Sequence, residues 1–400
     1  MLTYLFMTYN KNKGSSHRHN PTEESLENLI KDALSKSLCT GIAAAVSMDG
    51  KLFWSHCSGF TAREEPAAAQ SIENHDQASK VVIAPIDAET RFDVASMTKP
   101  LSTSLLILKA LQAGALDLKD PLGKYLPELN YKTGQIPILA LLTHTSGLPA
   151  IPALHSLFPD SERLDRNMAF ENLFSIEPEF AIGRHVVYSC TGYIFLGVLL
   201  ERISGMLLGE LFQKEIGTPL GLGQASFAES IGTSGEPKPL GNAVATEYCP
   251  WRHRRIQGQV HDESSYCLGG HSGNAGLFLS LNDAMAMGNF IMQEGAFNGN
   301  QILKPEIIQL LWREYTPGLE ERRSLGFKLH DSTTIDGPLW PPQSFGHTGF
   351  VGTSIFFEPQ RRLFAILLTN RVYFGREQTT DSIFAFRREF HSRVWRAFAE

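Results

Sequence analysis

Residues 41–60 read GIAAAVSMDGKLFWSHCSGF, and this stretch decides how the chain folds. Two strand-like runs, 42–47 and 52–55, flank the segment 48–51. Asp49-Gly50 lies at its centre, and Asp-Gly is a strong signal for a tight turn between antiparallel strands. The stretch therefore predicts a β-hairpin close to the N-terminal end.

Strand-like runs return near the other end of the chain, at residues 353–357 and 363–369. Between the two ends, residues 115–340 alternate helical patterns with glycine and proline breaks. The simplest topology is one antiparallel sheet that both chain ends build together. The sequence therefore predicts an α/β protein of the α+β kind, in which helices flank the sheet and a large helical domain is inserted.

Helical patterns border the sheet segments in sequence. Asn20-Pro21 with Glu23 has the cap, the proline and the acidic residue that are typical of a helix start. Near the C-terminus, apolar residues recur at helical spacing from Ile383 to Phe398. We divide the chain into a disordered segment 1–19, an α/β domain formed by 20–110 and 300–400, and a mainly helical inserted domain 111–299.

The composition excludes several classes of protein. Of 400 residues, 42% are apolar and 20% are charged, with a net charge of −6. These values exclude global disorder. A mildly acidic chain is poorly suited to bind nucleic acid or an anionic membrane, and no apolar run approaches the ~18–20 residues that span a bilayer. We expect neither nucleic acid nor a membrane among the partners.

Cysteine usage and the first residues bear on the compartment. The five cysteines are odd in number and include no C-x-x-C pair, which favours reduced thiols over a disulfide framework. Residues 1–20 lack the basic segment and the long apolar run of a secretory signal. Both observations predict a cytoplasmic protein, with export as the open alternative.

The sharpest chemical signal is Ser96-Met97-Thr98-Lys99, which opens a nearly continuous apolar run that ends at Ala113. Such a run predicts a buried helix, and a spacing of three places hydroxyl and amine on one face, about 5–6 Å apart at Cβ. Burial disfavours a charged lysine, and a neutral amine beside a serine is a base beside a nucleophile. The N–H groups of the helix start lie where an oxyanion would form. S-x-x-K also occurs by chance, so it does not decide the function alone.

Two further segments are less specific by themselves. Residues 188–190 read Tyr-Ser-Cys before an apolar helical pattern, where a lone tyrosine is often a core residue. Residues 346–350 read Gly-His-Thr-Gly-Phe before a strand, and a tight turn would explain them. The alternative is a binding segment, because glycines let a ligand approach the backbone closely.

Taken together and in this order, S-x-x-K, Y-S-C and H-T-G resemble the serine β-lactamase-related family, which includes class C β-lactamases, DD-peptidases and related esterases and aminopeptidases. The resemblance spans about residues 25–400. It also takes in the segments 92–95 (FDVA), 142–149 (LTHTSGLP) and 276–278 (GLF). The β-lactamase/transpeptidase-like fold of that family agrees with the topology predicted above.

The resemblance implies a role for each matching residue. Ser96 would be the nucleophile that becomes acylated, Lys99 its proton partner, and Tyr188 the residue that passes a proton to the leaving group. The backbone N–H groups of Ser96 and Phe350 would form the oxyanion hole. The substrate-binding positions that the resemblance implies are Cys190, His347, Thr348, Gly349 and Phe350.

Two positions depart from the family pattern. Cys190 stands where the family commonly has asparagine, and a thiol is a much weaker hydrogen-bond partner for a substrate amide. β-Lactams and other amides are therefore less favoured substrates than esters. His347 stands where lysine is usual, although some DD-peptidases and esterases also carry histidine there. Histidine is mostly neutral at pH 7, which weakens the expected binding of a substrate carboxylate.

The general base follows from ordinary pKa values. Removing the proton from half of the lysine or tyrosine side chains at pH 7 costs about 4–5 kcal/mol for either group. Burial lowers the pKa of a lysine but raises that of a tyrosine. We therefore expect Lys99 to be the base in acylation, with Tyr188 relaying a proton held between the two.

Other candidates carry less weight. His261, Asp262, Glu263 and His271 are possible metal ligands, but they lack H-E-x-x-H or C-x-x-C spacing, so we expect no metal and no cofactor. The basic segment 251–255 (WRHRR) is typical of a solvated loop, and the alternative is that it lines a cleft for acidic substrates.

The sequence predicts a serine hydrolase that forms an acyl-enzyme with a small ester, or with a small D-amino-acid amide or peptide. One alternative is a true DD-carboxypeptidase or β-lactamase, which would require export. The other is a catalytically silent binding or scaffold protein of the same fold, against which the presence of Ser96, Lys99 and Tyr188 argues. The oligomeric state is left open.

Overall fold

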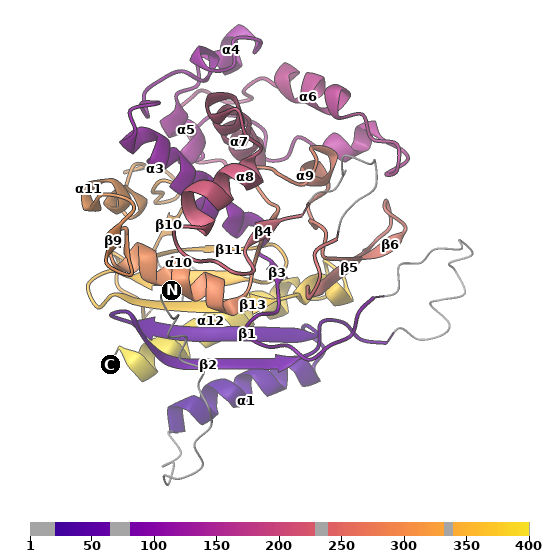
Figure 1. Ribbon diagram of the computed structural model, residues 1–400, viewed down its shortest axis with the longest axis vertical. Coiled ribbons are helices and arrows are strands. Elements are labelled where there is room, and N and C mark those ends of the chain that lie inside the picture. Colours follow the sequence, from indigo (N-terminus) through magenta and orange to yellow (C-terminus); the bar gives the residue numbers. More distant parts are fainter. Residues whose placement is uncertain (1–20, 65–80, 229–238, 332–338, 400) are drawn as a thin grey trace, which may run out of the picture.

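The computed structural model describes residues 21–64, 81–228, 239–331 and 339–399. Its main sheet has six antiparallel strands and joins the two chain ends (Figure 1). The strands follow the order β10 (Lys328–Leu329), β11 (Phe345–Thr348), β12 (Ser354–Glu358), β13 (Leu363–Thr369), β1 (Gly41–Met48), β2 (Lys51–Gly59). The predicted fold class is confirmed, whereas the predicted disordered segment 1–19 lies outside the described residues.

The predicted hairpin is the pair β1 and β2. Asp49 and Gly50 form its turn with φ values of 48° and 76°. Two positive φ values match the twist of the turn to that of the strands, and Asp-Gly tolerates them. Ile42 lies opposite Thr369 across the β1–β13 pair, so the N-terminal hairpin adds directly to the C-terminal strands.

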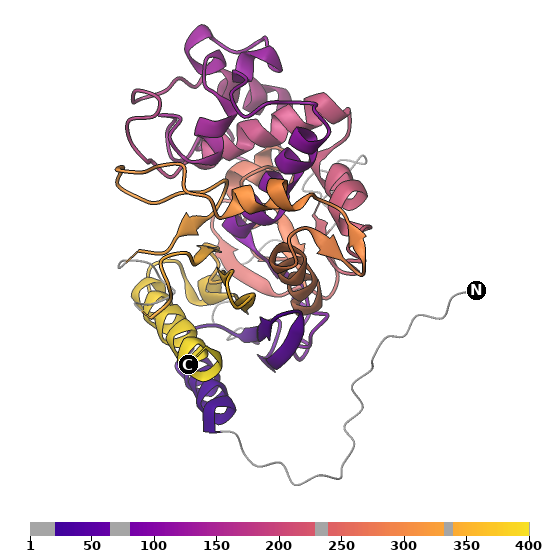
Figure 2. The ribbon, with the colours of Figure 1, turned by 90° about the vertical axis from the view of Figure 1, so that its left-hand side faces the viewer.

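The two faces of the sheet are covered by different helices. Alternate residues of β1, such as Ala44, pack against α1 (Pro21–Ser35) and α12 (Thr380–Phe398), which lie side by side (Figure 2). The residues between them, such as Ala45, face the larger core with α10 (Leu281–Met292). This is the period of two expected of a strand buried on both sides.

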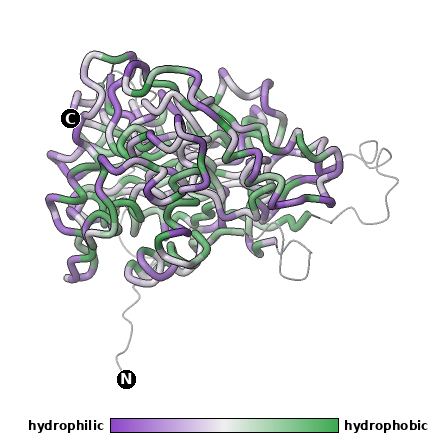
Figure 3. The backbone as a smooth tube through the Cα atoms, turned by 90° about the horizontal axis from the view of Figure 1, so that it is seen from above, coloured by the Kyte–Doolittle hydropathy of each residue, from purple (hydrophilic) through white to green (hydrophobic). Residues whose placement is uncertain are grey.

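The remaining helices form the upper part of the molecule in Figure 1, and all of them except α4 contribute residues to the same buried cluster as Ala45. Hydrophilic segments lie mostly around the outside (Figure 3). The domain boundaries at 110/111 and 299/300 stay a prediction. These helices are α3 (Leu105–Gln112), α4 (Tyr131–Gly134), α5 (Ile138–Leu142), α6 (Arg166–Ser175), α7 (Cys190–Ser204), α8 (Leu208–Phe212), α9 (Glu263–Cys267) and α11 (Pro305–Ile308).

The described residues also form three small antiparallel sheets. Among the described residues, none of the helices combines the length and the apolar character needed to cross a bilayer. The small sheets are β3 (Phe92–Asp93), β7 (Leu277–Leu279) and β4 (Ser226–Phe227); β5 (Ala245–Cys249) and β6 (Arg254–Gln257); and β8 (Ala296–Phe297) and β9 (Asn300–Gln301).

The apolar run that begins at Ser96 is helical but is not the single regular helix that the sequence suggests. A 3₁₀ turn, Ala95–Met97, leads into a π-helix, Lys99–Ser104, and α3 follows. Pro100 lies in the first turn of the π-helix and supplies no N–H for a regular ladder. All six side chains of the π-helix are buried, as predicted for this run.

Candidate active site

The turn that carries Ser96 is held by a buried carboxylate. Asp93 ends β3, and its Oδ1 accepts the N–H of Ala95 at 2.7 Å. Ala95 has a φ of 46°, a left-handed conformation that is uncommon for a residue with a side chain. Asp93 therefore stabilises a strained backbone directly before Ser96, whose side chain is partly exposed to the adjacent cleft.

Ser96 and Lys99 are in direct contact. Lys99 Nζ lies 3.0 Å from Ser96 Oγ, and the lysine side chain is fully buried. The same nitrogen lies 3.1 Å from the carbonyl oxygen of Asn274, 3.5 Å from Cys190 Sγ and 5.0 Å from the ring centre of Tyr188. The structure thus brings the S-x-x-K and Y-S-C segments together around one amine.

The surroundings of Lys99 act on its pKa in two directions. Burial lowers the pKa, whereas the neighbouring Cys190 and Tyr188 side chains, a hydrogen bond with Tyr188 and the charge of Asp262 raise it. The net direction is upward, so Lys99 favours the ammonium form. The neutral lysine base stays a prediction, and these neighbours oppose the desolvation on which it rests.

Tyr188 and Cys190 are positioned by the start of α7 and by His144. Ser189 caps α7, with its Oγ accepting the N–H of Gly192 at 3.1 Å. His144 Nδ1 accepts the N–H of Ser189 at 3.1 Å, and its ring lies 4.5 Å from the ring of Tyr188. Burial, with Arg323 and Lys99 nearby, holds the pKa of His144 well below its usual value. It therefore acts as a neutral acceptor.

The third motif lies on β11 and the bend that follows it. His347 is buried, and its Nδ1 lies 2.8 Å from the carbonyl oxygen of Thr348. Burial, followed by Lys99 and Arg323, holds the pKa of His347 well below its usual value. The neutral histidine expected from the sequence agrees with this environment.

The glycines of this motif are required by the packing of the protein, and the approach of a ligand to them stays a prediction. A Cβ at Gly346 would overlap the Phe356 ring. A Cβ at Gly349 would overlap Thr353 Oγ1 and the carbonyl oxygen of Val94. Since Val94 lies two residues before Ser96, Gly349 allows the end of β11 to pack against the nucleophile turn.

Ser96 and Tyr188 line a cleft of about 870 Å³ between β11 and α12. The predicted substrate-binding positions from His347 to Phe350 line it as well, whereas Lys99 and Cys190 lie behind its wall. Glu321 is the acidic residue among the described lining side chains. The basic ones, which the sequence reasoning missed, are Arg323, Lys328, Arg371, Arg387 and Arg388.

The four possible metal ligands predicted from sequence do not meet. His271 packs on Phe227, and Asp262 caps α9 through Ser265. His261 and Glu263 do approach one cluster, together with Glu247, but there the guanidinium of Arg376 binds both carboxylates. That guanidinium occupies the place between the carboxylates that a metal ion would need.

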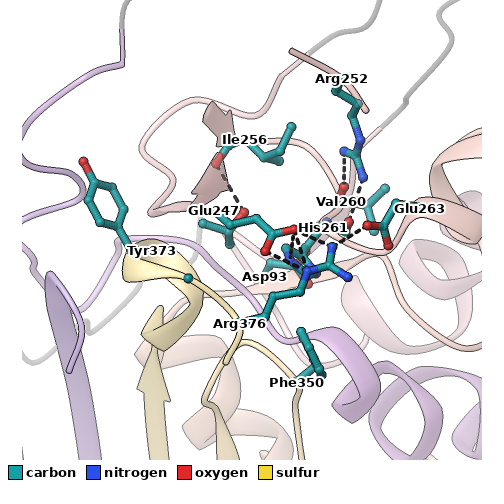
Figure 4. Close-up of polar contacts among 12 residues, drawn as sticks. Asp93, Glu247, Arg252, Ile256, Val260, His261, Glu263, Phe350, Tyr373 and Arg376 are labelled. Carbon is teal, nitrogen blue, oxygen red and sulfur yellow. Dashed lines mark hydrogen bonds and ion pairs between the residues drawn. The ribbon is translucent and has the colours of Figure 1, made fainter. Parts of the chain in front are cut away.

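The basic segment 251–255 does not line the cleft either. Arg252 is buried and donates to the carbonyl oxygens of Val260 and His261, at 2.7 Å each (Figure 4). Arg255 likewise donates to the carbonyl oxygen of Tyr373 at 2.7 Å. The expectation of a solvated loop is wrong for these arginines because backbone carbonyls bind their guanidinium groups.

Comparison with known proteins decides the family. A family model described as Beta-lactamase matches residues 26–388. The chain belongs to the beta-lactamase family. It is a serine hydrolase-type family, and the match covers both the S-x-x-K segment and the H-T-G segment.

Curated relatives of this beta-lactamase family member are hydrolases by name. It is 26% identical over 329 residues to an N-acetylmuramyl-L-alanine amidase of Bacillus subtilis, covering 76% of this chain and 74% of the relative. It is 27% identical over 315 residues to an Escherichia coli protein provisionally named a D-alanyl-D-alanine carboxypeptidase, covering 70% and 69%. Both alignments span more than two thirds of each protein.

Solved structures share the fold of this beta-lactamase family member. A penicillin-binding protein homologue from Caulobacter crescentus matches with a TM-score of 0.69 and 17% identity over 95% of this chain and 98% of its own. EstCE1, described as a hydrolase with promiscuous acyltransferase activity, matches with a TM-score of 0.67 and 18% identity over 94% and 99%. At this identity the likeness shows the architecture.

Proposed function

We propose that this protein hydrolyses a small ester, or a small D-amino-acid amide or peptide, through an acyl-enzyme on Ser96. The observation that carries the proposal is the 3.0 Å contact between Ser96 Oγ and Lys99 Nζ at the wall of an open cleft. A serine hydroxyl beside a buried amine, with Tyr188 next to both, is the arrangement that nucleophilic catalysis needs.

The raised pKa of Lys99 shapes the proton path. In the proposed mechanism Lys99 is an ammonium, and the form of the site that reacts carries a deprotonated Tyr188 beside it. The phenolate of Tyr188 takes the Ser96 proton while Ser96 Oγ bonds to the substrate carbonyl carbon. The carbonyl electrons move to oxygen, which the N–H groups of Ser96 and Phe350 stabilise.

The second half of the reaction reverses these roles. The intermediate collapses, and the leaving group departs with the proton from Tyr188. Water then loses a proton to Tyr188 and attacks the acyl carbon, and Ser96 regains its proton as the acid leaves. Throughout, Lys99 keeps its charge and stabilises the negative charge on its neighbours.

A second candidate, a DD-carboxypeptidase acting on peptidoglycan peptides, is favoured by the charge of the cleft. The guanidinium of Arg323 lies 5.6 Å from the Tyr188 ring centre, and its side chain is buried. The Arg323 guanidinium places a permanent positive charge in the cleft that Ser96 lines, whereas the neutral His347 places no charge there. Arg323 is paired with Glu321, so a peptide carboxylate would bind the guanidinium beside that carboxylate.

A substrate panel separates these candidates. p-Nitrophenyl esters, nitrocefin and D-alanyl-D-alanine peptides are incubated with the wild-type protein and with Ser96→Ala. We expect ester hydrolysis that disappears in the variant, with peptide hydrolysis if the second candidate is correct. A wild-type protein that turns over none of these substrates and takes no covalent label on Ser96 would support the silent binding protein instead.

A further inference from the structure

A charged cluster with a buried core, Glu247 and His261, lies next to the two proposed oxyanion donors. Glu247 on β5, His261 and Glu263 before and within α9, and Arg376 after β13 meet beside Phe350 (Figure 4). Arg376 Nε bonds the two Glu247 carboxylate oxygens at 2.9 and 2.8 Å, and its terminal nitrogen reaches Glu263. His261 Nε2 lies 3.1 Å from Glu247 Oε1.

The charge of Glu247 is fixed by its partners. Its side chain is 7% exposed, and such burial would raise its pKa. The hydrogen bonds from His261 and Arg376 outweigh burial and hold the pKa at about 2. Removing one partner from a buried ion pair is costly because it leaves a charge without compensation. The cluster is therefore confined to one geometry.

The cluster packs against the ring of Phe350, together with Arg371. The ring of Phe350 stacks on His261 with 5.6 Å between centroids, and the guanidinium carbons of Arg371 and Arg376 lie 4.7 and 5.7 Å from its centre. Arg371 Nε also donates to the Phe350 carbonyl oxygen at 2.9 Å. Phe350 is nevertheless 46% exposed and lines the cleft. Its position is therefore set by the contacts that its ring and carbonyl group make with these residues.

The same cluster is connected to the nucleophile turn. The backbone N–H of His261 donates to Asp93 Oδ2 at 2.7 Å, and Asp93 Oδ1 accepts the N–H of Ala95, also at 2.7 Å. His261 thus contacts Phe350 with its ring and, through Asp93, the backbone that precedes Ser96. The two proposed donors lie far apart in sequence and share this one support.

We propose that Glu247, His261 and Arg376 form a positioning cluster that sets the spacing between the N–H groups of Ser96 and Phe350. The inference rests on the proposed function and names positioning residues that do not touch the substrate. Oxyanion donors must lie 2.7–3.1 Å from the developing charge, and a misplacement of about 1 Å can cost 10²-fold in rate.

Glu247→Gln tests the proposal because it keeps the shape of the side chain and removes its charge. We expect kcat for a p-nitrophenyl ester to fall about 10- to 100-fold, with KM changed less than about threefold, because the oxyanion exists only in the transition state. An alkyl boronic acid, whose adduct on Ser96 would place an oxygen in the hole, should lose affinity by the same factor. Arg376→Lys keeps the positive charge but loses the planar guanidinium that binds Glu247 and Glu263 together. We expect the same losses of kcat and of boronate affinity.

Glu128→Gln is the matched control, because Glu128 pairs with Arg202 on α7 outside this cluster. It should keep wild-type kcat and boronate affinity. A folded Glu247→Gln protein with wild-type kcat would overturn the proposal, as would a loss of kcat with unchanged boronate affinity. If Glu247→Gln does not fold, Arg376→Lys provides the same comparison.

Hydrogen exchange separates this inference from the proposed function. In Glu247→Gln, backbone amides in the segments 93–97 and 348–351 should exchange faster than in wild type, and those of α7 should not. Unchanged exchange in both segments would overturn the positioning role. A wild-type protein inert toward esters and boronates would refute the proposed function, while the exchange data would still decide whether the cluster orders both segments.

Discussion

Gly349 packs directly on the backbone of Val94, with no room for a Cβ between them. This contact joins the end of β11, from the C-terminal half of the chain, to the turn that presents Ser96. Thr353 reinforces it with a hydrogen bond to the same Val94 carbonyl oxygen at 3.3 Å. The separation of the two sides of the proposed oxyanion hole therefore depends on Gly349 as well as on the charged cluster.

Gly349→Ala should damage activity more than stability. The added methyl must push β11 away from the Val94 carbonyl, and overpacking of this kind typically costs about 1–3 kcal/mol of unfolding free energy. We expect kcat/KM for an ester to fall at least about 100-fold in protein that is still folded. Gly223→Ala, where a Cβ meets open space, is the control for both measurements. Wild-type activity in folded Gly349→Ala would refute this reading.

Lys99→Met tests whether the lysine is a cation or a base. An ammonium near an anion favours the anion, so an opposite charge within about 4–6 Å shifts a pKa by about 1–3 units. Removing the Lys99 charge should therefore move the acid limb of the pH–rate profile about 1–3 units toward higher pH, with a large loss of kcat. If Lys99 were the base itself, the limb would vanish rather than move. Circular dichroism checks that the variant folds.

Cys190→Asn should shift substrate choice toward amides. A thiol is a weak donor and acceptor, and a buried substrate amide without a partner costs about 1–3 kcal/mol, or roughly 5- to 150-fold in rate. We expect the ratio of kcat/KM for nitrocefin over a p-nitrophenyl ester to rise within that range. Cys57→Asn, which changes a partly exposed thiol on β2, should leave the ratio unchanged. An unaltered ratio in Cys190→Asn would show that the thiol does not set selectivity.

Arg323→Gln should weaken turnover of substrates that carry a carboxylate. The guanidinium lines the cleft near Tyr188, and a charge-assisted hydrogen bond contributes about 1.5–3 kcal/mol. We expect kcat/KM to fall roughly 10- to 150-fold for a succinyl ester and less than about threefold for a neutral ester of similar size. Arg322→Gln is the control, because Arg322 binds Glu314 and does not line the cleft. Equal losses on both esters would exclude carboxylate recognition.

The sheet and its assembly from both chain ends were predictable because short-range patterns encode them. Asp49-Gly50 requires positive φ values that few residue pairs tolerate. The 363–369 run is continuously apolar because both faces of β13 are buried, and its predicted bounds agree with the structure. The π-helical turn after Ser96 was not predictable from periodicity, because a local change in hydrogen bonding leaves the apolar pattern intact.

Within the candidate site, the residues of the three motifs were predicted from the sequence. The residues that surround them and set their charge and position were not. Arg323 and Arg371 lie in segments without a recognisable spacing, and folding alone brings them to the cleft. His144 was part of the resemblance, but its contact with Ser189 depends on a tertiary hydrogen bond. The effect of Cys190 on the pKa of Lys99 was not foreseen for the same reason, because Cys190 lies 91 positions further along the chain.

Peptide mapping of a covalent adduct tests the central claim most directly. After reaction with a fluorophosphonate probe, we predict one adduct, on Ser96, and none in Ser96→Ala. Three nearby serines already serve the structure, since Ser146 and Ser189 accept backbone N–H groups and Ser272 binds Asn274. An adduct on any of these three, or undiminished labelling of Ser96→Ala, would contradict the account.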